Sequence, residues 1–419
     1  MERIPASDVL AISHVHDEHE IERRLGEGQD HHRSLVLRRI AFNPTVCALL
    51  WKALQGKKNG WQKVELRNVD GDVNAAINVC MAFNVMEEFQ LVINNTILLS
   101  PAWFAMGVGM RLNSKLKCLR ITTTLTGQGI AELGRGLKAD STGLETLDLS
   151  WSTFEGEDSV RELASALSEN SGLKNVTLMG CSLQDHYVAQ LVDSLQHHST
   201  LTHLDLNGNK SGHLSSVSIS TLLQSSQTIA KLDMSFQAIE EPLDVELLAN
   251  ALRLNSSLKV LDLSSCCIGD ESVSVLGHVL CESNRTLTEL LLARNRITDK
   301  GICDLSEMLP YMPNLRRLSL WGNPFEEKGA NVLARGLENN TEIEDVDLFR
   351  NFPCSEKINY FTCLNRGGRR LMHSTDAPIG LWPVVLERLG KIRIPNGTGT
   401  THLDLLFYMI RGPALFHAR

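Results

Sequence analysis

Aromatic residues and paired cysteine motifs are scarce in this sequence. Phe, Trp and Tyr make up 5% of the chain and hydrophobic residues 43%, so its core must be built largely from Leu, Val and Ile. The ten cysteines include no C-x-x-C pair, which removes the usual zinc and redox spacings. No apolar run reaches membrane-spanning length, and the N-terminus has no apolar signal segment. These absences predict a protein of a reducing compartment, cytoplasmic or nuclear, that does not enter a membrane.

Catalytic motifs are also missing. The sequence contains no G-x-x-x-x-G-K-[ST], H-E-x-x-H or G-x-S-x-G. Gly127, Gly129 and Gly134 briefly resemble a glycine-rich phosphate loop, but their spacing does not match the dinucleotide fingerprint. They fall where a turn meets a helix, and glycine there serves geometry. The sequence therefore predicts no catalytic residues, no metal site and no cofactor.

Charge is distributed unevenly along the chain. The net charge is −8, with −5 in residues 1–32, −8 in residues 33–352 and +5 in residues 353–419. An acidic body argues against nucleic-acid binding, which needs a basic face. Residues 1–32 hold five histidines, which allow a metal site or a solvated leader. Because their spacing does not match a structured site, the leader is favoured. The histidines are His14, His16, His19, His31 and His32.

One hydrophobic pattern, L-x-x-L-x-L, returns every 28 or 29 residues. Two weaker copies at Trp61 and Met86 precede the regular ones. This period predicts a solenoid, which offers a long repetitive surface. The regular copies begin at Leu116, Leu144, Leu173, Leu201, Ile229, Leu258, Leu287, Leu315 and Ile343.

A single repeat predicts a strand, a turn and a helix. Leu261 and Leu263 alternate with polar residues in a short strand, and Val273, Leu276 and Leu280 recur at helical spacing. Neither apolar face can be buried alone, so the repeats must stack. Because strands pack about 4.8 Å apart and helices about 8–10 Å apart, the stack should bend with a parallel sheet on its concave side.

A column of residues able to form hydrogen bonds follows the strands. We expect it to be buried and to bond to the backbone of the neighbouring coil, since buried turn amides need partners. The column reads Val69, Asn94, Thr124, Ser152, Cys181, Asn209, Gln237, Cys266, Asn295, Asn323 and Asn351.

The combined form L-x-x-L-x-L-x-x-N/C resembles the leucine-rich repeats of the ribonuclease-inhibitor-like class. The resemblance covers residues 61–352 and implies an α/β fold, a right-handed βα horseshoe with its parallel sheet on the concave side and its helices on the convex side. It also implies binding of other proteins, and the family includes inhibitors, GTPase-activating proteins and sensor arrays.

The domain organisation follows from this pattern. We expect residues 1–32 to form a flexible acidic leader and residues 33–60 an N-terminal cap, with a strand at Ser34–Ile40 and a helix at Thr45–Leu54. Residues 61–352 should form a solenoid of about eleven repeats. Residues 353–419 should provide a cap helix at Ile358–Met372 and an apolar, basic tail. Whether residues 373–419 pack on the solenoid or recruit a second partner stays open.

Between the two inward residues of each strand, one side chain should point into the concave face. Five of eleven such residues are Asp and one is Glu. They predict an acidic stripe that steers a basic partner, or Asp residues that are merely solvated. The column reads Glu65, Gln90, Arg120, Asp148, Thr177, Asp205, Asp233, Asp262, Leu291, Ser319 and Asp347.

Large aromatic residues stand just past four strands, and such residues are common in protein-binding surfaces. Leu291 breaks the polar column and begins an apolar patch, which Arg294, Arg317 and Arg350 border. The predicted partner-binding residues are Asp148, Trp151, Asp205, Asp233, Phe236, Asp262, Leu291, Arg294, Arg317, Trp321, Asp347, Phe349 and Arg350.

These features predict a monomeric, non-enzymatic scaffold that binds a protein partner on the concave sheet. One alternative, by analogy with the same repeat family, is a GTPase-activating protein for a small GTPase, although the acidic tail of some such proteins is absent. Another is a ubiquitin-ligase substrate receptor docking through its C-terminal tail. That idea depends on the order L-N-R (364–366) and L-W-P (381–383), which lacks the Cys expected at Asn365.

Overall fold

The computed structural model describes residues 9–15, 17–27, 32–55, 61–82, 89–138, 143–349, 352–370, 382–391, 401 and 405. It divides into two compact units, Met1–Ile229 and Ala230–Arg419. In both units, strands and helices alternate along the chain. Within the described residues, no helix combines the length and apolar character needed to cross a membrane.

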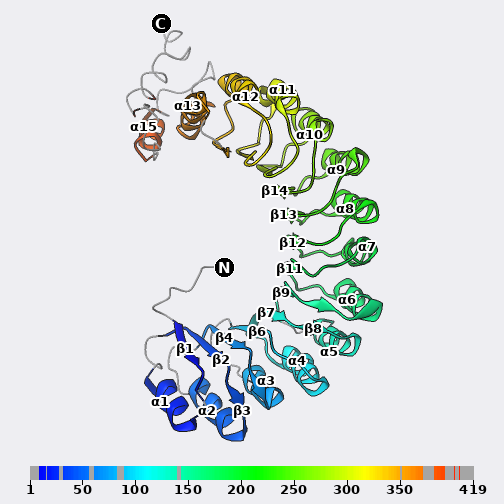
Figure 1. Ribbon diagram of the computed structural model, residues 1–419, viewed down its shortest axis with the longest axis vertical. Helices are drawn as coiled ribbons and strands as arrows, with labels where there is room; N and C mark the ends of the chain where they lie inside the picture. Colours follow the sequence, from blue (N-terminus) through cyan, green and yellow to red (C-terminus); the bar gives the residue numbers. More distant parts are fainter. Residues whose placement is uncertain are drawn as a thin grey trace. The chain divides into compact units, whose positions relative to one another are not determined.

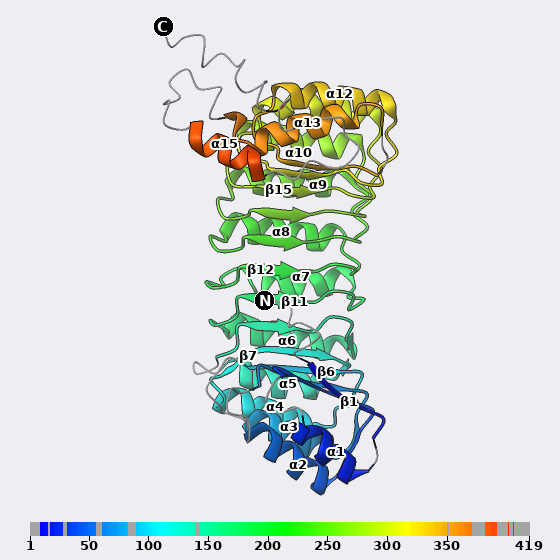
Figure 2. The same cartoon turned by 90° about the vertical axis from the view of Figure 1, so that its left-hand side faces the viewer.

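The first unit is a stack of strand–helix repeats. Its main strands pair in parallel in the order β1-β2-β4-β6-β7-β9-β11-β12, and β3 with β5 and β8 with β10 form two short ladders. The strands line one side of the unit and the helices the other (Figures 1 and 2). The elements are β1 (Val9–Ser13), α1 (Glu18–Glu27), β2 (Ser34–Arg38), β3 (Ala41–Phe42), α2 (Pro44–Gln55), β4 (Lys63–Arg67), β5 (Asp70–Gly71), α3 (Val73–Ala82), β6 (Phe89–Asn94), α4 (Ser100–Leu112), β7 (Leu116–Thr122), β8 (Thr124–Leu125), α5 (Gly127–Leu137), β9 (Thr146–Asp148), β10 (Thr153–Phe154), α6 (Gly156–Glu169), β11 (Asn175–Thr177), α7 (Asp185–Asp193), β12 (His203–Asp205) and α8 (His213–Ser225).

The second unit repeats the same plan, with parallel strands in the order β13-β14-β15-β16-β17. Its helices again cover the side of the strands opposite to the exposed face (Figure 1). The elements are β13 (Lys231–Asp233), α9 (Pro242–Leu254), β14 (Val260–Asp262), α10 (Asp270–Glu282), β15 (Glu289–Leu291), α11 (Asp299–Met308), the short 3-10 helix η2 (Leu309–Tyr311), β16 (Arg317–Ser319), α12 (Glu327–Asn339), β17 (Asp345–Asp347), α13 (Ser355–Arg366) and α15 (Trp382–Lys391).

The repeat pattern decides which side chains form the core. Leu261 and Leu263 of the strand row and Val273, Leu276 and Leu280 of helix α10 are all buried. Burying each such side chain stabilises the fold by about 1.5–3 kcal/mol. The leucine-rich-repeat solenoid, with a parallel sheet on one side and helices on the other, is therefore confirmed within each unit.

The polar column after the strands joins adjacent coils, as predicted. Asn295 donates from Nδ2 to the Leu263 carbonyl at 2.9 Å, and its Oδ1 accepts from the backbone N–H groups of Cys266 and Ile268 at 2.9 and 3.0 Å. Asn209 donates in the same way to the Leu178 carbonyl, and Ser152 to that of Ile121. The column therefore satisfies the turn amides that stacking buries.

Two early repeats differ from the predicted alignment, and we call the strand and following turn of one repeat a row. They are the rows of β6 and β7. Val92, and not Gln90, lies opposite Glu65, because Gln90 pairs with Lys63 in the ladder of β4 and β6. The ladder of β6 and β7 also shifts its register between Phe89 and Gln90. The column residue of that row is accordingly the buried Thr96, and Asn94 points to the strand face instead.

In the row of β7, the turn after the strand has one residue fewer before the column position than in the later rows. Thr124 therefore pairs with Thr153, while Thr123 takes the column position and donates to the Thr96 carbonyl. The prediction placed Thr124 in the buried column, but its side chain is exposed.

The acidic leader also differs from expectation. Val9–Ser13 forms a strand parallel to β2, and Glu18–Glu27 forms a helix. Ile12, Ile21 and Leu25 are buried there, so this segment is a further repeat hidden among charged residues. Residues 34–55, expected as the cap, form the next repeat inward. In the described residues no group of three or more His, Cys, Asp or Glu could hold a metal; His16 and His31 lie outside them.

Helix α13 covers the last strand row. Phe361 and Leu364 are buried, and Asn365 donates to the carbonyls of Asn340 and Ile343 at 3.1 and 2.9 Å. Arg369 is buried and reaches the Leu337 carbonyl. The segment 364–366 therefore serves as a cap, which leaves Leu364 and Asn365 inaccessible to an adaptor. Most of the tail, residues 371–381 and 392–400 included, lies outside the described residues.

Candidate functional site

The predicted acidic column has a local structural role. In Asp148, Asp205, Asp233 and Asp262, Oδ1 accepts the backbone N–H two residues later at 2.9–3.0 Å. These bonds hold the turn that follows each strand. Burial raises the pKa of Asp262, an effect that the hydrogen bonds from Ser264 oppose. The carboxylates are therefore partly occupied within the repeat.

The next position along the turn takes a left-handed backbone conformation in most rows. Trp151 has φ 63°, Phe236 φ 57° and Arg294 φ 55°. Bulky residues are disfavoured there, at a cost of about 1–3 kcal/mol. Yet the side chains of Trp151 and Phe236 are 64% and 55% exposed. They lower stability without adding to the core, which distinguishes them from the buried leucines. Glycine occupies the position at Gly180, Gly208 and Gly322.

In the second unit three predicted residues come together. The Arg294 guanidinium lies 4.5 Å from the centre of the Trp321 ring. Phe349, 57% exposed, meets Trp321 edge to face with ring centres 5.0 Å apart. Such contacts are worth about 0.5–1.5 kcal/mol each. We call Arg294, Trp321 and Phe349 the aromatic cluster.

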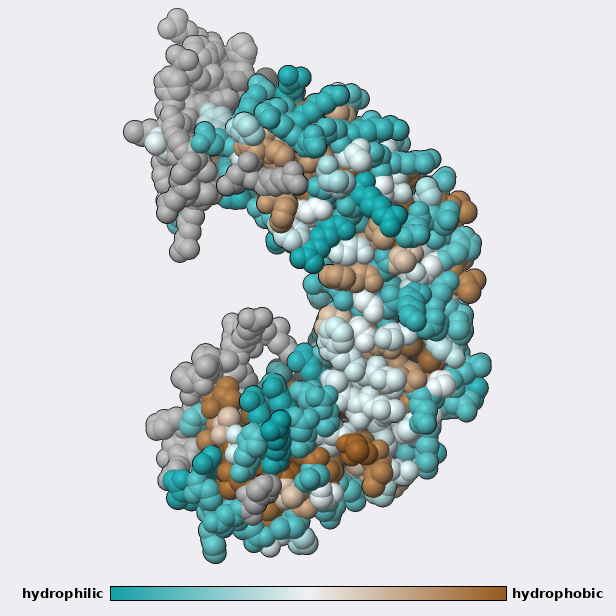
Figure 3. Space-filling view, viewed as in Figure 1, coloured by the Kyte–Doolittle hydropathy of each residue, from teal (hydrophilic) through white to brown (hydrophobic). Residues whose placement is uncertain are grey.

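The other predicted residues of the second unit are placed differently. Leu291 lies half-buried on β15, and Arg317 pairs with Asp345, Nε to Oδ2 at 3.4 Å. Asp347 is exposed and accepts from the Ser319 hydroxyl at 3.2 Å. Arg350 lies outside the described residues. Figure 3 shows apolar groups set among hydrophilic ones on the surface of this unit.

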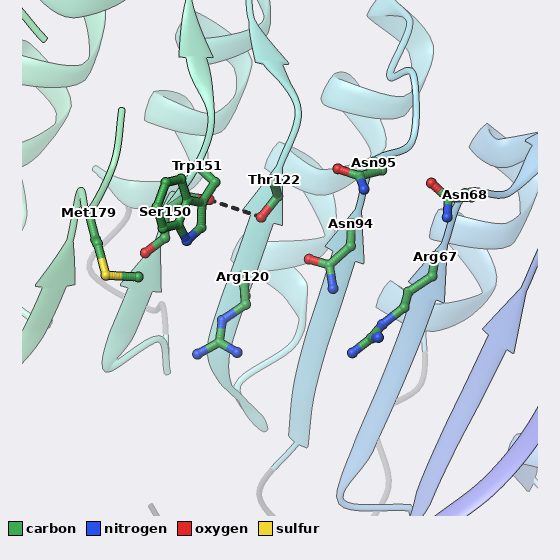
Figure 4. A pocket seen from close by; sticks show the side chains of 9 residues that line it. All are labelled: Arg67, Asn68, Asn94, Asn95, Arg120, Thr122, Ser150, Trp151 and Met179. Atoms are coloured by element: carbon green, nitrogen blue, oxygen red, sulfur yellow. Dashed lines mark hydrogen bonds between the residues drawn. The ribbon is translucent and has the colours of Figure 1, made fainter. Parts of the chain in front are cut away.

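The first unit carries a depression of about 610 Å³ on its strand side, which the sequence alone did not predict. Arg67, Asn94 and Arg120 project side by side from three consecutive strands, and Trp151 stands at one end (Figure 4). We call it the strand-side depression. The available signal was the run of Arg and Asn at the ends of consecutive strands. Its lining residues are Arg67, Asn68, Asn94, Asn95, Arg120, Thr122, Ser150, Trp151 and Met179.

Cations are the accessible charges in this depression. Glu65 is buried beneath Arg67, with which it pairs, and Lys63 Nζ also reaches its Oε2 at 3.0 Å. Arg120 pairs with the buried Asp148. Burial, and secondarily the neighbouring Arg120 and Arg67, lower the pKa of Lys63. Burial and the adjacent Arg38 likewise lower the pKa of Arg67.

Comparisons with known proteins agree with this architecture. A family model described as "Leucine Rich repeat" matches residues 254–277 and 283–305. The chain is 30% identical over 237 residues to mouse "NACHT, LRR and PYD domains-containing protein 14", covering 56% of this chain and 24% of that protein. It is 28% identical over 193 residues to rat "Leucine-rich repeat-containing protein 73", covering 45% of this chain and 60% of that protein.

Two solved structures are more distantly similar. They are leiomodin-1 actin-binding site 2, with a TM-score of 0.34 and 18% identity over 36% of this chain and 89% of that one, and the tropomodulin C-terminal domain of Caenorhabditis elegans, with a TM-score of 0.33 and 14% identity over 42% and 99%.

The recurring strand–helix unit, the column that joins adjacent coils and the sequence matches to leucine-rich repeat proteins define the class. The chain is a leucine-rich repeat protein. It spans about a quarter of the length of the mouse relative. Leucine-rich repeats in general serve as modules for protein interaction.

Proposed function

We propose that this protein is a non-enzymatic interaction module that captures a partner protein on the strand side of its repeats. Trp151 in the first unit and the aromatic cluster in the second would be the anchors. The supporting observation is that Trp151 and Phe236 keep exposed aromatic side chains at positive φ, where other rows use glycine. Strain held at an exposed position is typical of functional sites.

The aromatic cluster supports the same function independently. Trp321 and Phe349 offer a rigid apolar surface that loses little conformational entropy on binding, and Arg294 adds hydrogen-bond donors at its edge. No specific observation in the described part of the chain favours GTPase activation or ubiquitin-ligase docking.

The test is affinity capture with the tagged full chain, followed by quantitative mass spectrometry. Trp151→Ala and the double variant Trp321→Ala/Phe349→Ala should lose a defined set of captured proteins, with little change in melting temperature. Phe104→Ala is the matched control, because Phe104 is similarly exposed but lies on helix α4, outside the strand face. If both strand-side variants capture the same proteins as the wild type, the proposal is wrong.

A further inference from the structure

The strand-side depression of the first unit combines accessible cations, free amides and an aromatic wall. Arg67 and Arg120 are 41% and 49% exposed at their side chains, whereas the carboxylates beneath them are 2% and 8% exposed. Both carboxylates therefore lie below the guanidinium groups. A ligand approaching from solvent meets the positive charges first.

The cations of this region outnumber the carboxylates. Arg38 lies opposite Arg67 in the neighbouring strand, and Lys63 shares the single carboxylate of Glu65 with Arg67. Arg67 and Arg120 line the depression, Lys63 and Arg38 lie beside Arg67, and the carboxylates that pair with these cations are those of Glu65 and Asp148. The excess positive charge favours an anionic ligand.

Uncommitted donors stand beside the cations. Asn68 and Asn95 have φ 47° and 48°, a conformation that Asn tolerates well. Both side chains are exposed and line the depression. In the part of the chain that the structure describes, neither side-chain amide has a hydrogen-bond partner. They are available to bond to a carboxylate or to an extended backbone.

Trp151 and Met179 provide an apolar wall at one end of the depression (Figure 4). Arg67 and Arg120 stand on β4 and β7, which β6 separates. Strands are about 4.8 Å apart, so the two cations are separated by about 10 Å across the sheet. A peptide in the extended polyproline II conformation rises about 3.1 Å per residue with three residues per turn, so side chains three residues apart lie on the same side, about 9 Å from each other.

We propose that the strand-side depression binds an extended acidic segment of a partner protein, with two carboxylates three residues apart on Arg67 and Arg120 and an apolar side chain against Trp151. This deepens the proposed function and depends on it. It also reverses the partner charge predicted from the acidic column, since the local hydrogen bonds and ion pairs described above occupy its carboxylates.

The probe is a fluorescein-labelled peptide, GSESSESFSG, together with its reversed sequence, and binding to the full chain is measured by fluorescence anisotropy at low salt. At least one of the two should bind, and replacing both Glu by Gln or by Lys should remove binding. Arg67→Gln and Arg120→Gln should each weaken binding about three- to tenfold, and Trp151→Gly by a similar factor. Arg135→Gln on helix α5, which removes the same charge from the opposite side, should leave binding unchanged.

Because Arg120→Gln leaves Asp148 buried without its partner, the double variant Arg120→Gln/Asp148→Asn is measured as well and should also bind weakly. Equal loss with Arg135→Gln, tighter binding of the Lys peptide, or tighter binding of a labelled single-stranded DNA oligomer would overturn the proposal. If only Trp321→Ala/Phe349→Ala loses captured proteins, the proposed function stands. The peptide measurements then decide separately whether the strand-side depression binds an acidic segment.

Discussion

The six-membered ring of Trp151 lies against the backbone of Gly180 in the next row, so closely that a Cβ added to Gly180 would meet ring carbons at 2.6 Å. The two residues occupy the same turn position in consecutive rows, with φ 63° and 66°. Arg294 and Gly322 repeat this relationship in the second unit, where the added Cβ would lie 3.0 Å from Arg294 Cγ. In both places the large side chain of one row lies against a glycine in the next, whereas Ser265 follows Phe236 at the same position.

Gly180→Ala should destabilise the protein more than Gly208→Ala. Both positions have positive φ, and that strain costs about 1–2 kcal/mol in each variant. Only the methyl group added by Gly180→Ala also collides with Trp151, since the nearest atom to a Cβ at Gly208 is 3.6 Å away. The collision should add about 1–3 kcal/mol, measured by urea unfolding.

The double variant Trp151→Gly/Gly180→Ala provides the control for this contact. Removing the ring should recover the additional loss, and the coupling energy from the double-mutant cycle should equal it. Equal destabilisation by Gly180→Ala and Gly208→Ala would show that Trp151 does not rest on this backbone.

Asn295→Ala should cost about 3 kcal/mol of unfolding free energy. The change leaves two buried N–H groups, those of Cys266 and Ile268, and the Leu263 carbonyl without their partner. Asn314→Ala is the control, because Asn314 makes one exposed hydrogen bond to the Arg285 carbonyl and should change stability by less than about 1 kcal/mol. Chemical denaturation measures both, and similar values for the two variants would contradict a coil-joining role.

Asp233→Ala and Asp233→Asn should separate structure from charge. Asp233 accepts hydrogen bonds from the backbone and the hydroxyl of Ser235. Asn retains an acceptor oxygen and should be almost neutral, whereas Ala should lose about 1 kcal/mol. Captured proteins should be the same for Asp233→Asn and the wild type. If a captured protein is lost from Asp233→Asn while the stability of the variant is unchanged, Asp233 contacts that partner directly through its charge.

The buried thiols should be unreactive in the native state. Burial is the first cause that raises the pKa of Cys80, Cys181 and Cys266 to about 12, against an ordinary value of 9.0. At pH 8, iodoacetamide should therefore label Cys267, Cys281 and Cys303, which are partly exposed, much faster. Peptide mapping after timed labelling measures this, and labelling of Cys80 at the rate of Cys281 would be inconsistent with its burial.

The same shifts make stability fall at alkaline pH. These thiols remain protonated when folded but ionise above about pH 9 when unfolded, so the unfolded state gains up to about 1.4 kcal/mol per thiol for each pH unit between 9 and 12. Their contribution is thus complete below pH 9 and is lost as the pH rises towards 12. Cys80→Ala should reduce the slope of unfolding free energy against pH in that range.

Several features could be predicted from the sequence because every repeat places the same kinds of residue at the same spacing. Leu261 and Leu263 belong to a period of two within one strand, and Asn295 occupies a position that recurs every 28 or 29 residues. The predicted positions were wrong where a row departs from the common spacing. Phe89, Leu91 and Ile93 alternate in a way that permits two registers, and only the pairing of β6 with β4 and β7 chooses between them.

By itself, the sequence determined the repeating strand–helix unit, its core residues and the column that joins its coils, because these depend on local spacing. Tertiary structure alone decided the first repeat, where Ile12 and Ile21 find buried neighbours among charged residues. It also decided the charge that the strand side presents. Arg120 and Asp148 are 28 residues apart, and their pairing follows only when stacking sets adjacent strands side by side.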